Sequence, residues 1–329
     1  MSIDFFVREI FNFSMPLLIV ALGGMFAERS GVVNIALEGI MTIGAFVGIV
    51  FIFFMQGDIT HGLHPQIVLL IGFLLAAAAG TLISLAHAYA SVNMRADQII
   101  SGTAINMFAG AFAIYIARQI RGVQQIPFRN VPFLIEEVPL LSRIPVVGSM
   151  LFQRTFITVY VGILILIAAW VVMFKTRLGL RIRACGEHPH AAQSLGVSVV
   201  KMRYIGVLIS GALAGLGGLV FILPISNEFD ANVAGYGFLA LAVLIFGQWK
   251  PWRILFAALF FGSLRALSSA YTGIQWTFRG ETVRMLDIGI PGVVYEMLPF
   301  VATLLVLVFT SKRSQAPKAI GQPFEVGKR

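Results

Sequence analysis

Three polar residues lie along one face of an apolar segment near the start of the chain. Asn34, Glu38 and Thr42 are spaced four residues apart, so on a helix they form a single stripe. A carboxylate within a membrane span is costly and usually faces the bundle interior or a water-filled path. Glu38 lies close to the start of its segment, so its side chain could instead reach the water interface. The stripe predicts a path for a polar solute, with interface placement as the alternative.

Two further polar residues occur inside apolar segments. Asn106 belongs to a polar patch in the run 98–118, where hydrogen bonding between helices is an equal alternative to a role in the path. Arg265 is near the middle of another run and needs a partner or water, for which Glu38 and Glu296 are candidates. The predicted substrate path therefore comprises Asn34, Glu38, Thr42, Asn106 and Arg265.

The motifs of common catalytic sites are absent from the sequence. A phosphate-binding loop would read GxxxxGK[ST], but the only Lys followed by Ser or Thr is Lys175, and Phe174 replaces the glycine before it. HExxH and GxSxG do not occur, and the five histidines show no convincing metal-ligand spacing. The sequence therefore predicts neither an enzyme nor a metal or other cofactor held by this chain.

A strongly polar run stands between two long apolar segments in the middle of the chain, within residues 174–218. Pro189 suits the first position of a helix, where its missing N–H is not needed. Gly196 stands where a left-handed C-terminal cap is wanted. These two residues predict a helix of about two turns, roughly 10 Å long, between two membrane spans.

Basic residues surround this helix, against the single acid Glu187. A loop so rich in Lys and Arg next to membrane spans belongs in the cytoplasm. One interpretation is an ordinary positively charged cytoplasmic loop, and the other is a docking helix for a cytoplasmic partner. The residues predicted to dock are Arg177, Arg181, Arg183, Glu187, Pro189, His190, Ala191, Ala192, Gln193 and Gly196.

The elements that must position these residues are membrane helices. The chain is 58% hydrophobic and 12% charged, which is far outside soluble globular usage, and several apolar runs reach spanning length. The net charge of +9 comes largely from the central loop and the tail, where membrane orientation explains it, so no nucleic-acid partner is expected. The composition predicts an all-α polytopic membrane protein.

The apolar runs predict eight or nine crossings, because the run 236–247 is either a short tilted span or a re-entrant half-helix. Rows of small residues, such as Ala76, Gly80 and Ser84, predict closely packed helices. We expect one transmembrane domain over 1–310, with 176–203 as a cytoplasmic loop and 311–329 as a disordered cytoplasmic tail. The nine-span count puts the N-terminus outside. The predicted spans are 10–27, 33–55, 66–90, 98–118, 155–175, 204–225, 236–247 joined to 254–272, and 289–310.

Several segments together resemble a known family. They are FAERSGVVNIALEGIMTIGAF (26–46), YGFLALAVLIFGQWKP (236–251), MLPFVATLLVLV (297–308), and the basic loop continuing into SGALAGLGG (210–218). They are similar to permease subunits of bacterial ABC importers, and more closely to the branched-chain amino acid/ribose permease superfamily and its purine-nucleoside permease group. The resemblance covers nearly the whole chain, and AERSGVVNIALEG is its most specific part.

The resemblance implies a bundle similar to type II ABC importer permeases, in the bacterial cytoplasmic membrane and in contact with lipid. RACGEHPHAAQSLG is similar to the coupling helix that docks on the ATPase. The implied partners are a cytoplasmic ABC ATPase, which uses the ATP, a second permease subunit, and an extracytoplasmic lipoprotein that delivers a small-molecule substrate. Segments 31–49 and 236–247 could be corresponding pieces of an inverted repeat lining the path.

The function expected from this resemblance is nucleoside import. A simple sugar such as ribose, or a branched-chain amino acid, is the alternative substrate for the same machine. An ion-coupled secondary transporter, which needs no ATPase, is the alternative from another class. It would favour more paired intramembrane acids and bases than the sequence contains.

Overall fold

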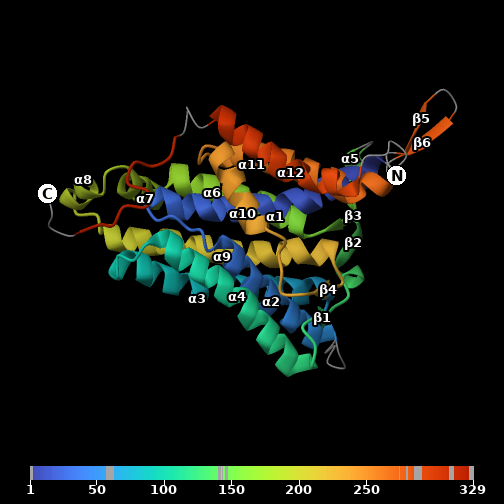
Figure 1. Cartoon of the computed structure of the whole chain (residues 1–329), viewed down its shortest axis with the longest axis horizontal. Coiled ribbons are helices and arrows are strands. Elements are labelled where there is room, and N and C mark those ends of the chain that lie inside the picture. Colours follow the sequence, from blue (N-terminus) through green and yellow to red (C-terminus); the bar gives the residue numbers. More distant parts are fainter. Residues whose placement is uncertain are drawn as a thin grey trace.

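The molecule is a bundle of helices that run between two ends (Figure 1). The computed structural model describes residues 3–56, 63–139, 142, 144, 147–273, 275–278, 281–284, 291–310 and 315–325. The helices that build the bundle are α1 (Ile3–Arg29), α2 (Leu37–Gln56), α3 (Pro65–Ala88), α4 (Gln98–Arg121), α6 (Thr158–Lys175), α9 (Val199–Ile225), α10 (Tyr236–Phe246), α11 (Pro251–Ala270) and α12 (Gly292–Thr310).

The two ends of the bundle carry different elements. One end bears α7 (Arg177–Glu187), α8 (Pro189–Ser194) and the C-terminal segment, and we call it the α8 end (Figure 1). The opposite end bears the N-terminus and α5 (Val147–Leu151). Three antiparallel strand pairs also lie there: β1 (Ile126–Pro127) with β4 (Glu228–Phe229), β2 (Leu134–Glu137) with β3 (Gln153–Phe156), and β5 (Gln275–Phe278) with β6 (Glu281–Arg284).

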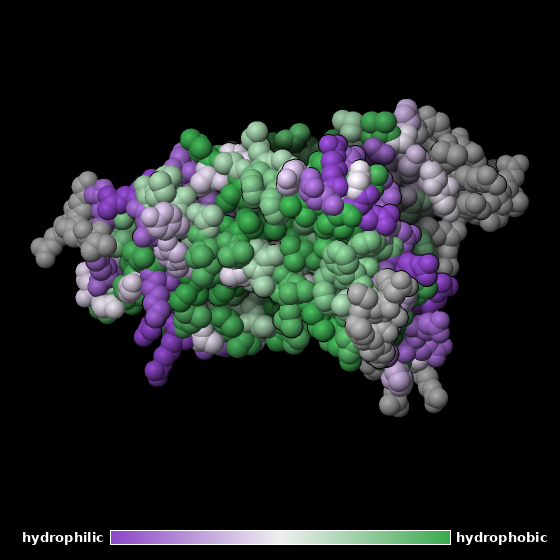
Figure 2. All heavy atoms as spheres, turned by 90° about the horizontal axis from the view of Figure 1, so that it is seen from below, coloured by the Kyte–Doolittle hydropathy of each residue, from purple (hydrophilic) through white to green (hydrophobic). Residues whose placement is uncertain are grey.

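The all-α polytopic fold predicted from the composition is confirmed. Among the described residues, seven helices are long and apolar enough to cross a membrane, and Tyr236–Phe246 and Gly292–Leu305 are shorter apolar helices. On the face shown in Figure 2 a broad hydrophobic zone lies between hydrophilic residues gathered toward the two ends. This distribution is what a bilayer requires, because the hydrocarbon layer meets the middle of the bundle and water meets its ends.

Helix α9 lies at the centre of the bundle and packs against α1, α2 and α3. The small-residue row on α3 meets α9: a Cβ atom added at Gly215 would lie 2.3 Å from the carbonyl oxygen of Ala76 and 2.9 Å from the Cα of Gly80. No side chain fits between the two backbones, so glycine is required at this contact. The close approach predicted from these rows is confirmed.

Two interruptions bring non-helical backbone into the bundle. Residues 30–36 separate α1 from α2, and residues 230–235 connect the end of β4 to α10. Helix α10 has 11 residues, which makes it about 16 Å long, roughly half the thickness of a hydrocarbon core. The run 236–247 therefore forms a half-helix that follows an irregular segment. Ala234 and Gly235 lead into it with φ values of 51° and 76°.

The C-terminal segment differs from the expectation of a disordered tail. The backbone N–H of Ala319 donates to the carbonyl of Gly186 (2.8 Å), and that of Gly321 donates to the carbonyl of Gly31 (3.1 Å). Hydrogen bonds to carbonyls of the folded bundle offset the entropy of ordering the segment, and the polar composition of the tail does not reveal those partners. Residues 311–314 and 326–329 lie outside the described residues.

Candidate functional site

The Glu38 carboxylate joins the two interruptions of the bundle. Its Oε1 accepts the backbone N–H of Gly235 (2.9 Å) and its Oε2 accepts that of Gly237 (2.6 Å). These N–H groups belong to the start of α10, where a helix has no partners of its own for its first amides and favours a negative charge. Glu38 thus caps the half-helix from the first turn of α2.

Asn106 supports the turn that leads into α2. From α4, its Oδ1 accepts the backbone N–H of Gly39 (2.7 Å), and its Nδ2 donates to the carbonyl of Ile35 (3.0 Å). One side-chain amide therefore satisfies a donor and an acceptor at the end of the interruption 30–36. Hydrogen bonding between helices, the alternative left open for this residue, is what the structure describes.

Asn34 and Thr42 are the other residues of the predicted stripe, but Asn34 lies in the interruption 30–36, before α2 begins, so the three do not share one helix face. The Nδ2 of Asn34 donates to the Ser210 hydroxyl on α9 (2.8 Å), and its buried Oδ1 has no partner within the described part of the chain. The hydroxyl of Thr42 donates to the carbonyl of Glu38 in its own helix (2.9 Å). We call Asn34, Glu38, Thr42 and Asn106, with the backbone that they bind, the intramembrane junction.

Arg265 takes part in neither ion pair that was considered for it. Its guanidinium carbon lies 5.9 Å from the centre of the Tyr236 ring at the start of α10. In the described part of the chain, Arg265 forms no ion pair with Glu38, which caps α10, or with Glu296, whose side chain is exposed. Asn106 and Thr42 therefore bind backbone of residues 35–39, Glu38 and Asn34 bind α10 and α9, and Arg265 lies beside α10.

The helix predicted at Pro189 is confirmed as α8. Pro189 is its first residue and Gly196 has φ of 79° just beyond its end. The N–H of Gly196 donates to the Gln193 carbonyl (2.9 Å), so the left-handed glycine terminates the helix as predicted. The Ala192 methyl is buried, whereas His190 and Ala191 on the same helix are exposed.

Sequence reasoning missed the helix before it. In α7 the Thr176 hydroxyl accepts the N–H of Gly179 (3.2 Å) and caps the N-terminus, while Ile182 and Cys185 are fully buried. A threonine followed by apolar residues at helical spacing is the signal that predicts such a helix. Of the three predicted arginines, Arg177 and Arg181 on α7 are exposed, and Arg183 lies 4.9 Å over the Phe174 ring.

Two exposed leucines near these arginines were also missed. Leu195 follows the last residue of α8 and is 85% exposed, and Leu180 on α7 is 61% exposed. Large apolar side chains left open next to basic residues are typical of a surface that a protein partner covers. We call the exposed residues Arg177, Leu180, Arg181, His190, Ala191 and Leu195 the docking surface.

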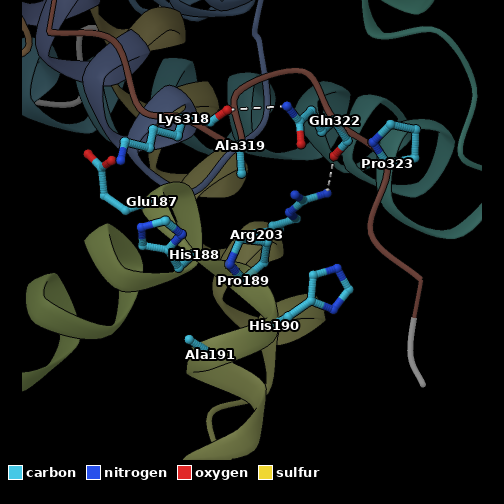
Figure 3. Close-up of a pocket in the computed structure, with 10 residues that line it drawn as sticks. All are labelled: Glu187, His188, Pro189, His190, Ala191, Arg203, Lys318, Ala319, Gln322 and Pro323. Carbon is cyan, nitrogen blue, oxygen red and sulfur yellow. Dashed lines mark hydrogen bonds between the residues drawn. The ribbon is translucent and has the colours of Figure 1, made fainter. Parts of the chain in front are cut away.

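A cavity of about 410 Å³ separates α8 from the C-terminal segment (Figure 3). Its lining includes Glu187, His190 and Lys318. Glu187 forms an ion pair with Arg29 at the end of α1 (3.5 Å). Arg203 also lines it but is only 1% exposed, and its Nη1 donates to the Gln322 carbonyl (2.9 Å).

Comparison with known protein families gives one match that spans nearly all of the chain. The family described as "Branched-chain amino acid transport system / permease component" matches residues 6–308. The chain belongs to this permease family. Its members are transport components, so the chain is a transport subunit and not an enzyme.

Three relatives of the permease family resemble the chain over most of their length. The guanosine ABC transporter permease protein NupQ of Bacillus subtilis (strain 168) is 43% identical, over 96% of this chain and 95% of the relative. The nucleoside ABC transporter permease protein NupC of Lactococcus lactis subsp. cremoris (strain MG1363) is 38% identical, over 97% and 96%. The putative glucose ABC transporter permease protein TsgC13 of Haloferax volcanii is 32% identical, over 76% and 73%.

As an ABC-transporter permease, the chain is an integral protein of the inner membrane and one component of a system that includes an ATPase. No solved structure matches it. The likeness to type II importer permeases therefore stays a prediction.

Proposed function

We propose that this permease carries nucleosides through the cytoplasmic membrane into the cell, driven by a separate ATPase that binds the docking surface. The observation that carries the proposal is the similarity to NupQ and NupC over nearly the whole of each chain. A second permease subunit would complete the path, and an extracytoplasmic lipoprotein would deliver the nucleoside. The α8 end would then face the cytoplasm, in agreement with its basic residues.

Helix α8 fits the role of coupling helix because it is short, begins and ends at defined residues, and is exposed on its outer face. Pro189 and Gly196 fix where it begins and ends, and the buried Ala192 anchors it to the bundle. A helix held in this way moves as a unit when a partner pushes on His190, Ala191 and the adjacent Leu195. The basic side chains of Arg177 and Arg181 would meet acidic groups of the ATPase.

Replacing Ala192 with proline tests the docking assignment. Proline removes the N–H that donates to the His188 carbonyl (3.0 Å) and breaks α8. We expect loss of nucleoside uptake and of ATPase co-purification, with insertion into the membrane intact. Ser194→Ala is the matched control, since it changes an exposed residue of α8 outside the docking surface and keeps the helix. Normal uptake by the proline variant would refute the assignment.

The substrate is tested by competition in proteoliposomes that contain the complete system. Uptake of labelled guanosine should be inhibited by other nucleosides and unaffected by ribose, glucose or leucine. TsgC13 favours a sugar as the second candidate, and inhibition by glucose or ribose alone would establish it. Uptake that requires an ion gradient and no ATP would indicate a secondary transporter instead.

A further inference from the structure

The C-terminal residues 315–325, which we call the strap, touch the interruption 30–36 and the turn after α10. At one end of the strap, the N–H of Gln315 donates to the Oε1 of Gln248 (2.9 Å), which lies in the turn after α10. Further along, the N–H of Gly321 donates to the carbonyl of Gly31 (3.1 Å) at the start of the interruption 30–36. The strap thus holds Gly31, near one end of the interruption 30–36, and Gln248, just beyond one end of α10. The other ends of these two segments meet at Glu38.

The strap also touches α7, α8 and α9. The N–H of Ala319 donates to the Gly186 carbonyl at the end of α7 (2.8 Å). Phe324 is buried, and its ring centre lies 5.2 Å from that of His190 on α8 and 5.8 Å from the Arg203 guanidinium carbon. One short segment therefore contacts α8, the interruption 30–36 and the turn after α10.

We propose that the strap is the linkage through which α8 acts on the intramembrane junction. This inference rests on the proposed function, because it takes α8 to be the helix that the ATPase moves. Displacement of α8 pulls on Phe324, and the strap passes this movement to Gly31 and Gln248. Both segments then shift at the point where Glu38 holds the start of α10, so Gln322 and Phe324 are positioning residues for transport.

Arg203 makes the contact between strap and bundle easy to open. Its Nη1 donates to the Gln322 carbonyl, but Nε and Nη2 are buried without a hydrogen-bond partner among the described residues. A buried guanidinium with unpaired N–H groups is unfavourable, and lifting the strap would return those groups to water. Their hydration offsets part of the free energy needed to lift the strap at Gln322, so the strap can shift there while its contacts with Gly31 and Gln248 hold.

The cavity between α8 and the strap provides room for this movement. Figure 3 shows His190 on one side of the space and the strap residues Lys318 to Pro323 on another, with Arg203 between them. The strap follows α8 through the buried Phe324, which belongs to the same apolar cluster as Ala192 on α8. The open space beside this contact lets the rest of the strap change its geometry without breaking the core of the bundle.

Truncation tests the proposal in the complete reconstituted transporter. Ending the chain after residue 314 removes the strap, and ending it after residue 325 is the matched control. We expect the strapless permease to retain ATPase co-purification and ATP hydrolysis, while nucleoside uptake falls by about tenfold or more, as for the loss of a coupling energy. The control should transport normally. Uptake that survives removal of the strap would overturn the proposal.

The co-purification result separates this inference from the proposed function. If the full-length permease itself binds no ATPase, the proposed function fails. If only the strapless permease loses the ATPase, the strap belongs to the docking surface and the linkage is refuted. Phe324→Ala provides a milder variant should truncation impair folding: uptake should fall while ATP hydrolysis continues, and Phe324→Tyr should restore uptake by restoring the ring contact. Equal uptake by the alanine and tyrosine variants would also refute the linkage.

Discussion

Polar side chains have different partners at the intramembrane junction and at the docking surface. At the junction, Glu38 and Asn106 satisfy backbone groups that the interrupted helices leave without partners. At the docking surface, Arg181 and His190 are exposed, and Leu195 beside them is 85% exposed. The junction uses its side chains within the chain, whereas the docking surface keeps them available for another molecule.

The difference follows from the two surroundings. Lipid offers no hydrogen bonds, so irregular backbone at membrane depth must find partners inside the protein. Water satisfies exposed polar groups at the ends of the bundle, and side chains there need no internal partner. For a polar residue in a span, the first question is therefore whether it replaces a missing backbone hydrogen bond. Only then is it considered as a ligand for the transported solute.

The largest effect is expected when Glu38 is replaced with leucine. Two N–H groups at the start of α10 would lose their acceptor, and each unsatisfied donor costs about 1–3 kcal/mol. The free energy of unfolding should fall by roughly 2–6 kcal/mol, which thermal unfolding of the purified permease would measure. Glu296→Leu is the control, because that carboxylate is exposed on α12. A Glu38 variant as stable as wild type would instead favour a direct role in the substrate path.

A smaller loss of stability is expected for Asn106→Leu. The substitution leaves the N–H of Gly39 and the carbonyl of Ile35 without their partner, at a site that is only half-buried. We expect the free energy of unfolding to fall by about 1–4 kcal/mol. Thr103→Val on the same helix should have little effect, since within the described part of the chain the Thr103 hydroxyl bonds to carbonyls of α4 itself. Equal unfolding temperatures for the two variants would mean that Asn106 does not stabilise the junction.

The sequence predicts the ends of α8 better than the hydrogen bonds of the junction, because the two signals differ in range. Pro189 and Gly196 determine the ends of α8 by their own backbone chemistry, so that helix is visible locally. The hydrogen bond between Glu38 and Gly235 joins residues 197 positions apart, and no local sequence pattern predicts it. The spacing of Asn34, Glu38 and Thr42 predicts one helix face, but Asn34 lies in the interruption before α2, and the spacing does not reveal that backbone amides bind the Glu38 carboxylate.

Replacing Leu195 with aspartate at the docking surface should weaken binding of the ATPase and leave the stability of the permease unchanged, the reverse of the effect expected at the junction. A leucine that becomes buried in an interface contributes about 1.5–3 kcal/mol, so affinity for the ATPase should fall by roughly ten- to a hundredfold. The unfolding temperature should not change, because the side chain touches little of the permease itself. Titration of the ATPase onto permease in nanodiscs measures the effect, with Leu195→Met as the control. Unchanged affinity would exclude Leu195 from the interface.

The smallest effect is expected for the reactivity of the Cys185 thiol. It tests whether water is excluded from the buried face of α7, whose other face is exposed. Burial raises the pKa of the Cys185 thiol to about 11, against about 8.5 for a free cysteine. The native thiol therefore stays protonated near pH 8 and should react with maleimide roughly a hundredfold more slowly than after unfolding. Because the native pKa lies above the unfolded one, this burial favours the folded state below about pH 8.5 and loses that contribution as the pH rises toward 11. Rapid labelling of the intact permease at pH 8 would mean that water reaches α7 from both sides, and the contrast between its two faces would disappear.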